Sequence, residues 1–198
     1  MLLPNQLTVL RIILTPVFLF LFLMDDPLMK QISIFVFMVA AVTDWYDGWL
    51  ARKFNYITAW GQFLDPLADK ILTSAAFIGF VILGILPAWM VIVIVIRDFL
   101  ITGLRAYAEF RKHYFTTSKS AKWKTFLQMT FIYYLLVVYT LGTFQVVVVD
   151  YKYIYDLLSD ATIIYFSMLG VTLFTLITGI QYIVKNKKLI KKLFTVED

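Results

Sequence analysis

The chain has 198 residues, of which 61% are hydrophobic and 16% are charged, and its mean hydropathy is +0.81. Soluble domains usually hold about half apolar and about a quarter charged residues, so a sizeable water-soluble domain is excluded. The absence of cysteine excludes disulfides and thiolate chemistry. The net charge of +5 does not indicate a nucleic-acid partner, because the basic residues fall at the ends of apolar runs, where they meet anionic lipid.

Six apolar runs use most of the chain, and each is close to the roughly 20 residues that a bilayer-spanning helix needs. They are Leu7 to Met24, Met29 to Leu50, Phe63 to Leu83, Pro87 to Phe110, Trp123 to Val149 and Ile154 to Val184. The first run lacks the flanking features of a signal peptide, so we expect it to remain a membrane helix. The sequence therefore predicts an all-α integral membrane protein with six transmembrane helices in a single domain over residues 1–198.

The distribution of Lys and Arg predicts the orientation of this domain. Of the 18 basic residues, 13 fall on one side of the runs, two on the other and three within them. Because cytoplasmic loops carry the excess of Lys and Arg, we expect both termini in the cytoplasm, with a basic tail from residue 185 to 198. The 13 are Arg11, Arg52, Lys53, Arg111, Lys112, Lys119, Lys122, Lys124 and the five lysines of residues 185–192.

Four aspartates stand at the cytoplasmic ends of the second and third runs, at positions 44, 47, 65 and 69. Charged side chains in membrane segments are rare and usually functional. Asp44 and Asp47 are three residues apart and Asp65 and Asp69 four apart, so each pair projects from one face of its helix. The connection from Arg52 to Trp60 is short enough to hold the two helices antiparallel. We therefore expect the four carboxylates to converge.

Four clustered carboxylates repel one another unless a cation neutralises them. Oxygen ligands of this kind suit Mg²⁺ or Mn²⁺, and two ions bridged by shared carboxylates are consistent with the number of acids. The single histidine, His113, lies in a basic loop, which argues against zinc. The alternative is a network of hydrogen bonds between helices, in which some aspartates stay protonated.

Two glycines and an arginine accompany these acids. Gly48 and Gly61 remove side chains beside the expected metal site, so a bulky ligand can approach closely, although small residues also serve helix packing. Arg52 lies two turns after Asp44 and can form paired hydrogen bonds with a phosphate. These groups together suit a polyphosphate bound to a divalent cation.

The stretch from Asp44 to Asp69 resembles the signature of the CDP-alcohol phosphatidyltransferases, D-x2-D-G-x2-A-R-x8-G-x3-D-x3-D, at every fixed position. The resemblance implies a multi-pass enzyme of the bacterial cell membrane, homodimeric, with its site facing the cytoplasm. It implies that Asp44, Asp47, Asp65 and Asp69 bind metal, and that Asp69 is also the general base. It further implies that Gly48, Arg52, Gly61 and, more weakly, Thr58 line the site for the CDP-linked lipid.

The N-terminus and the fourth run carry a second pattern. Asn5 can cap a helix that begins at Gln6, with Thr8 and Arg11 on one face and Arg11 extending to the interface. In the fourth run, Arg97, Ile101 and Arg105 share a helical face. Arg97 can pair with Asp98 or with an aspartate of the site. Near the same level lie Arg105, Arg111, Lys122 and Lys124, more positive charge than the local acids require, which suggests an anionic acceptor.

Residues 4–11, 97–105 and 122–128 resemble the bacterial branch of this family that forms phosphatidylglycerophosphate. That resemblance places Asn5 and Thr8 near the CDP-diacylglycerol and implies transfer of its phosphatidyl group to sn-glycerol 3-phosphate, with release of CMP. The acceptor phosphate would be bound by Arg105 and by one or more of Arg111, Lys122, Lys124 and Arg11. Asp98 stands where the usual motif has glutamate, which leaves its role open.

Two alternatives to this interpretation remain. Another member of the family could use inositol phosphate, inositol or phosphatidylglycerol as the acceptor. An ion-coupled transporter could also place Asp and Arg inside the membrane, although no inverted repeat is visible. Measuring turnover with each alcohol distinguishes glycerol 3-phosphate from the other acceptors. Metal-dependent CMP formation in detergent, where no gradient exists, distinguishes an enzyme from a transporter.

Overall fold

The computed structural model describes residues 3–54, 59–111, 115 and 119–194, and this part of the chain is α-helical without strands. Six of its helices have 20 to 28 residues. They are α1 (Leu3–Phe22), α2 (Pro27–Phe54), α3 (Ala59–Ile82), α4 (Ala88–Phe110), α5 (Lys119–Leu141) and α8 (Ala161–Lys185). Three shorter helices are α6 (Gln145–Asp150), α7 (Lys152–Leu158) and α9 (Lys187–Phe194). The prediction of an all-α fold is confirmed.

Two stretches of the described chain are long and apolar enough to cross a membrane, Ser120–Leu141 and Lys152–Lys185. Shorter apolar segments occupy Gln6–Phe22 and Pro27–Thr43. Large apolar side chains such as Phe20, Phe35 and Phe166 are more than half exposed on the outer faces of the helices. Because soluble proteins rarely expose so much apolar surface, these features indicate a membrane protein.

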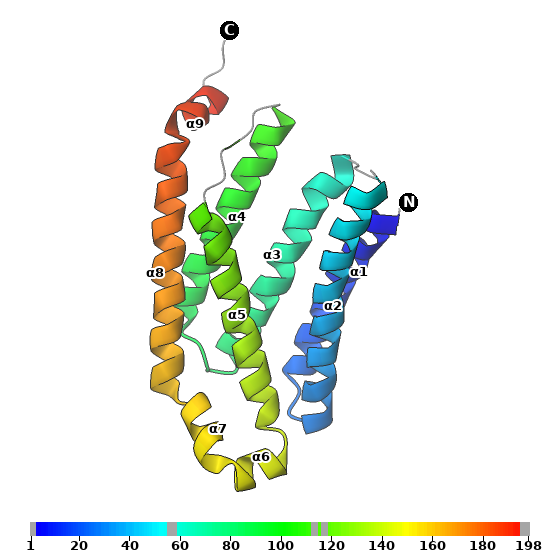
Figure 1. Cartoon of the computed structure of the whole chain (residues 1–198), viewed down its shortest axis with the longest axis vertical. Helices are drawn as coiled ribbons and strands as arrows, with labels where there is room; N and C mark the ends of the chain where they lie inside the picture. Colours follow the sequence, from blue (N-terminus) through cyan, green and yellow to red (C-terminus); the bar gives the residue numbers. More distant parts are fainter. Residues whose placement is uncertain (1–2, 55–58, 112–114, 116–118, 195–198) are drawn as a thin grey trace.

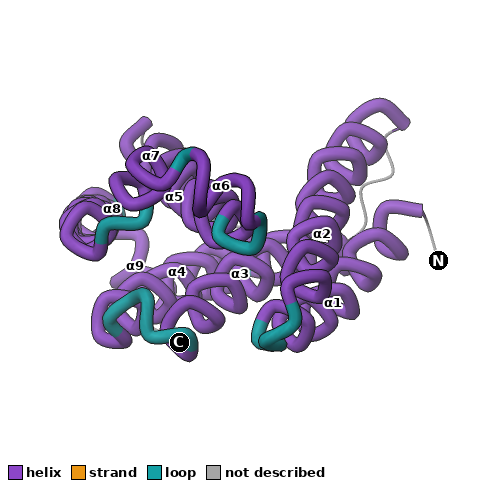
Figure 2. The backbone as a smooth tube through the Cα atoms, turned by 90° about the horizontal axis from the view of Figure 1, so that it is seen from below, coloured by secondary structure: helices purple, strands orange, loops and turns teal. Residues whose placement is uncertain are grey.

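The long helices run up and down the bundle, so that their ends collect at two levels (Figure 1). α1 begins at the same end at which α2 terminates, α3 begins and α9 lies, whereas α6 and α7 lie at the opposite end. The view along the bundle shows α6 and α7 on the side of α5 and α8, away from α1 (Figure 2). α1 packs on α2 and α3, and α4 packs on both α3 and α8.

The interior of the bundle has two regions, one packed with aromatic side chains and one that contains buried polar and charged side chains. Phe18 of α1 lies 5.3 Å from Phe22 and 5.1 Å from Phe37 of α2, measured between ring centroids. Phe22 also packs edge-on against Phe80 of α3. These side chains are fully buried and belong to the aromatic region. Buried charged residues lie elsewhere, Asp98 in the middle of α4 and Lys124 near the start of α5, and they mark the polar region, which holds the candidate site.

The fifth and sixth predicted helices are wrong in their extent. α5 ends at Leu141 rather than at Val149, because a turn follows in which the Thr143 amide and hydroxyl both donate to the Thr140 carbonyl. α8 begins at Ala161 rather than at Ile154, because the Asp160 carboxylate accepts from the amides of Thr162 and Ile163. This cap is the usual way in which an aspartate starts a helix. Hydropathy alone did not reveal either break.

Other helix ends agree with the sequence in part. The turn predicted around Gly84 and Pro87 is confirmed: Gly84 has a positive φ of 72° and Pro87 is the N-cap of α4. The predicted cap at Asn5 is wrong, because α1 already begins at Leu3, and Pro4 is tolerated in a first helical turn. The basic tail includes a helix, α9, that the sequence did not predict.

Candidate active site

α3 places Asp65 and Asp69 one turn apart at the polar end of the bundle. The hydroxyl of Thr8, on α1, donates a hydrogen bond to Oδ1 of Asp65. Thr8 itself is only 1% exposed, so this contact joins the N-terminal motif to the signature. Asp69 forms an ion pair with Lys70, whose Nζ lies 3.0 Å from Oδ2 of Asp69. The structure therefore brings two of the predicted metal ligands and one predicted lipid-site residue together.

For the remaining signature residues, the structure describes the helix to which most of them belong but not their side chains. Asp44, Asp47, Gly48 and Arg52 belong to α2, and Gly61 belongs to α3, but their side chains lie outside the described part. Asn5 belongs to α1 with the same restriction, and Thr58 lies outside the described residues altogether. Among the residues that are described, no group of three or more acidic, His or Cys side chains could hold a metal ion.

The chemistry of the described donors can be compared with the metal that the sequence predicts. Asp65 and Asp69 present carboxylate oxygens, and Thr8 orients one of them. Hard divalent cations such as Mg²⁺ take oxygen ligands and are commonly bound through one or two carboxylates. The donor set of Asp65 and Asp69 therefore fits Mg²⁺ or Mn²⁺.

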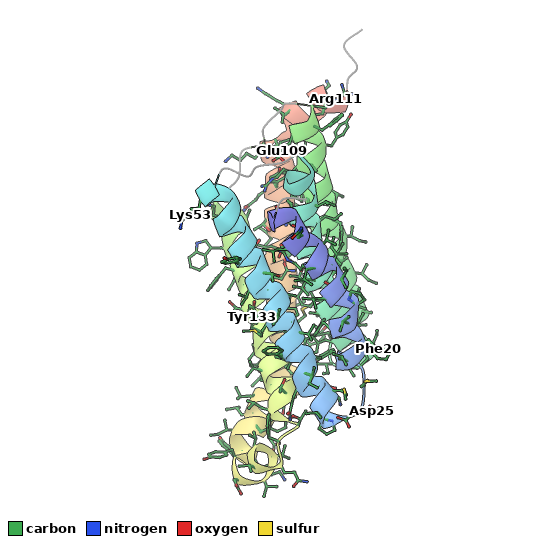
Figure 3. All side chains as sticks on the ribbon, turned by 90° about the vertical axis from the view of Figure 1, so that its right-hand side faces the viewer. Phe20, Asp25, Lys53, Glu109, Arg111 and Tyr133 are labelled. Carbon is green, nitrogen blue, oxygen red and sulfur yellow. The ribbon has the colours of Figure 1, made fainter. Side chains whose placement is uncertain are left out.

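A pocket of about 880 Å³ includes Asp69 in its lining and is formed by residues of α3, α4 and α5 and by Tyr182 of α8. It follows α4 from Arg97 to Glu109, about 18 Å at the helical rise of 1.5 Å per residue. Glu109 lies at the same end of the bundle as Lys53 and Arg111, and Asp25 lies at the other end (Figure 3). The polar residues of its lining are Asp69, Lys70, Arg97, Asp98, Thr102, Arg105, Glu109, Lys122, Thr125 and Tyr182.

This lining carries more positive than negative charge. Its basic side chains are Lys70, Arg97, Arg105 and Lys122, and its acidic ones are Asp69, Asp98 and Glu109. A fifth basic residue, Lys124, is buried against Asp98 and neutralises that carboxylate. The pocket is therefore suited to an anion, whose carboxylate or phosphate oxygens the basic groups can bind.

Asp98 is the centre of an ion network that joins three helices. Its Oδ1 accepts from Nζ of Lys124 on α5 and lies 3.1 Å from Nη1 of Arg97. Its Oδ2 lies 4.0 Å from Nζ of Lys70 on α3. The side chains of Asp98 and Lys124 are 3% and 1% exposed, whereas those of Lys70 and Arg97 are 15% and 14% exposed. The predicted alternative, an internal pair between Arg97 and Asp98, is thus confirmed.

The structure separates the residues that were predicted to bind the acceptor phosphate. Arg105 and Lys122 line the pocket. Lys124 is 1% exposed and is directed to Asp98, and Arg11 is fully buried in α1. Arg111 is exposed at the end of α4, where its guanidinium donates to the Tyr107 hydroxyl. Two of the five therefore lie at the pocket surface.

Three charged or aromatic polar residues of the pocket, Lys70, Glu109 and Tyr182, were not predicted from the sequence. Lys70 follows Asp69 directly, and an intramembrane lysine beside an aspartate could have indicated it. Tyr182 comes from the apolar stretch of α8, where nothing in the sequence distinguishes it from other aromatic residues of membrane helices.

Known proteins resemble this chain over most of its length. Residues 1–153 match the family model described as CDP-alcohol phosphatidyltransferase. A protein of Rickettsia bellii named CDP-diacylglycerol–glycerol-3-phosphate 3-phosphatidyltransferase is 33% identical over 94% of this chain and 96% of its own length. A Bacillus subtilis protein of the same name is 46% identical over 52% of this chain, and the match spans only 60% of that protein. A probable phosphatidylglycerophosphate synthase of Mycobacterium tuberculosis is 38% identical, with 64% of this chain and 61% of that protein covered.

The helical bundle, the aspartates of α3 and these matches together define the class of protein. The chain belongs to the CDP-alcohol phosphatidyltransferase family. Members of this family are transferases and are generally dependent on a divalent metal.

Proposed function

We propose that the chain transfers the phosphatidyl group of CDP-diacylglycerol to sn-glycerol 3-phosphate, releasing CMP and forming phosphatidylglycerophosphate. The observation that carries the acceptor assignment is the pocket in which Asp69 and the basic residues Arg105 and Lys122 share one cavity. An acceptor that has a hydroxyl at one end and a phosphate at the other suits this arrangement. The names of the Rickettsia and Bacillus relatives support the same reaction.

In the proposed reaction, the primary hydroxyl oxygen of glycerol 3-phosphate forms a bond to the phosphorus that carries the diacylglycerol. The bond from that phosphorus to the bridging oxygen breaks, and CMP leaves with that oxygen. Asp69 accepts the hydroxyl proton as general base. Lys70 fixes the orientation of the Asp69 carboxylate, while Arg105 and Lys122 bind the acceptor phosphate.

The CDP-linked lipid would be bound on the other side of Asp69. Asp44, Asp47, Asp65 and Asp69 would hold Mg²⁺ or Mn²⁺, two ions in our proposal, which neutralise charge on the pyrophosphate. Arg52 would bind a phosphate, and Gly48 and Gly61 would leave room for the nucleotide. Asn5, Thr8 and Thr58 complete the proposed lipid site, and the Thr8 bond to Asp65 supports the place of Thr8 in it.

We also propose the arrangement of the chain in the membrane. The six long helices would cross the bacterial cell membrane as a single domain over residues 1–198, with both termini and the site at the cytoplasmic face. The position of α9 at the same end as the beginning of α1 supports this orientation (Figure 1). We propose a homodimer as the assembled form.

The acceptor is tested by supplying purified protein with CDP-diacylglycerol and one alcohol at a time, and measuring CMP. We expect metal-dependent CMP release with glycerol 3-phosphate and little with inositol, inositol phosphate or phosphatidylglycerol. Release with inositol phosphate alone would assign a different acceptor. Absence of CMP with every alcohol would contradict the enzymatic proposal and leave the transporter alternative.

Arg105→Ala is expected to raise the KM for glycerol 3-phosphate by about tenfold or more, because hydrogen bonds to charged groups contribute about 1.5–3 kcal/mol. The KM for CDP-diacylglycerol should change little. Arg111→Ala removes an arginine at the end of the same helix but away from the pocket lining, so we expect a smaller effect. Steady-state CMP release with each substrate varied measures both values. Equal changes in the two KM values of Arg105→Ala would indicate a structural arginine.

A further inference from the structure

The C-terminal half of α8 carries a buried polar face, and Tyr182 of this face lines the pocket. Its buried residues change from apolar, at Ile164 and Met168, to polar or small over the last four turns. The polar or small ones are Thr172, Thr175, Thr178, Gly179 and Tyr182. α8 lies outside the residues that the family model matches. Thr and Gly on such a face can serve helix packing, so it is Arg97 and Tyr182, which line the pocket, that indicate a ligand.

Arg97 of α4 is fixed on this face. Its Nη2 donates to the Thr178 hydroxyl at 3.3 Å, while its Nη1 lies 3.1 Å from Asp98. A Cβ added at Gly179 would lie 3.1 Å from Cγ and 3.2 Å from Nε of Arg97. Gly179 therefore leaves the space in which the Arg97 side chain passes along α8, and any larger residue would displace it. The guanidinium is thereby held at the pocket wall.

Tyr182 lies one turn after Thr178 and lines the same pocket. The residue is 3% exposed, and its hydroxyl lies near the Arg105 guanidinium of the same pocket. No described residue accepts a hydrogen bond from this hydroxyl. A guanidinium can only donate, so the tyrosine hydroxyl remains able to donate to an anionic oxygen. Burial of Tyr182 at the wall of a positively charged pocket thus points to an anionic ligand.

We propose that α8 forms a wall of the acceptor site, in which Tyr182 donates to the acceptor phosphate and Thr178 and Gly179 position Arg97 beside it. This inference rests on the proposed function, because it assigns further residues to the same acceptor. It makes Tyr182 a binding residue and Gly179 a positioning residue. Both would act on the anionic acceptor and not on the CDP-linked lipid.

The test compares two conservative pairs of variants on α8. Tyr182→Phe removes one hydroxyl, and Tyr165→Phe does the same at an exposed tyrosine far from the pocket. Gly179→Ala adds a methyl group against Arg97, and Gly170→Ala adds one where nothing lies within 4 Å. The KM values for glycerol 3-phosphate and CDP-diacylglycerol are measured from CMP release. The rise in unfolding temperature caused by glycerol 3-phosphate provides a second readout of binding.

We expect Tyr182→Phe to raise the KM for glycerol 3-phosphate about tenfold, with no change in the KM for CDP-diacylglycerol. Gly179→Ala should act in the same direction, and both controls should match the wild type. A Tyr182→Phe protein that keeps the wild-type KM and the wild-type thermal shift would overturn the inference, and so would equal changes in both KM values. A wild-type protein without CMP release would instead contradict the proposed function.

Discussion

Replacement of Asp69 by asparagine is expected to lower CMP release from CDP-diacylglycerol by between about 10²- and 10⁴-fold, the usual contribution of a general base. An amide has nearly the size of the carboxylate but cannot accept the proton of the acceptor hydroxyl. Asp69 lines the basic pocket, and its carboxylate lies 3.0 Å from Nζ of Lys70, so the change removes the group that we propose as the base between the two substrates. Single-turnover measurements with saturating substrates would report the chemical step directly.

Asp160→Asn is a matched control for this variant. Asp160 caps α8 through the amides of Thr162 and Ile163, and asparagine caps helices about as well as aspartate. The control therefore makes the same chemical change with no expected loss of turnover. If Asp69→Asn retained turnover close to that of the control, Asp69 would not be the base. Metal polarisation of the acceptor would then have to carry the deprotonation.

The sequence was informative wherever a property depends on spacing along one helix. The four-residue separation of Asp65 and Asp69 predicted their common face, and α3 places them one turn apart. The pairing of Arg97 with Asp98 was among the predicted alternatives, and the ion pair is present. Such contacts are local, so helical geometry alone determines them.

The contacts between distant segments could not be predicted in this way. Arg97 donates to Thr178, 81 residues further along the chain, and no pattern in either helix specifies the partner. Because of its positive charge and its expected depth in the membrane, Lys124 was predicted to bind the acceptor, yet it is buried against Asp98. Periodicity cannot decide which face of a helix meets which neighbour when most residues around it are apolar. The same limitation hid the polar face of α8.

The ion network explains why an acid follows Arg97. Three basic residues from three helices lie within 4.0 Å of the Asp98 carboxylate, so without it their charges would repel one another inside the bundle. One of the three, Lys70, also pairs with Asp69. Asp98 thus connects the packing of α3, α4 and α5 to the position of the proposed base. The acid here is one carbon shorter than glutamate, and its carboxylate still reaches both Arg97 and Lys124.

Asp98→Asn is expected to destabilise the folded protein by about 3–5 kcal/mol, because removing one partner of a buried ion pair leaves the other charge uncompensated. Lys124 is 1% exposed and cannot reach water without moving its helix. Thermal unfolding of the purified protein in detergent measures the loss. Asp156→Asn changes an exposed residue of α7, a helix at the opposite end of the bundle (Figure 1), and should have no comparable effect.

A second substitution, at Lys124, tests whether the uncompensated charge causes the destabilisation of Asp98→Asn. In the Asp98→Asn background, Lys124→Met removes the uncompensated ammonium and fills its volume with an apolar side chain, so we expect part of the lost stability to return. A double variant that is no more stable than Asp98→Asn would contradict this explanation. The destabilisation would then come from the contacts of Asp98 with Arg97 and Lys70, whose cationic groups would still lack their shared carboxylate.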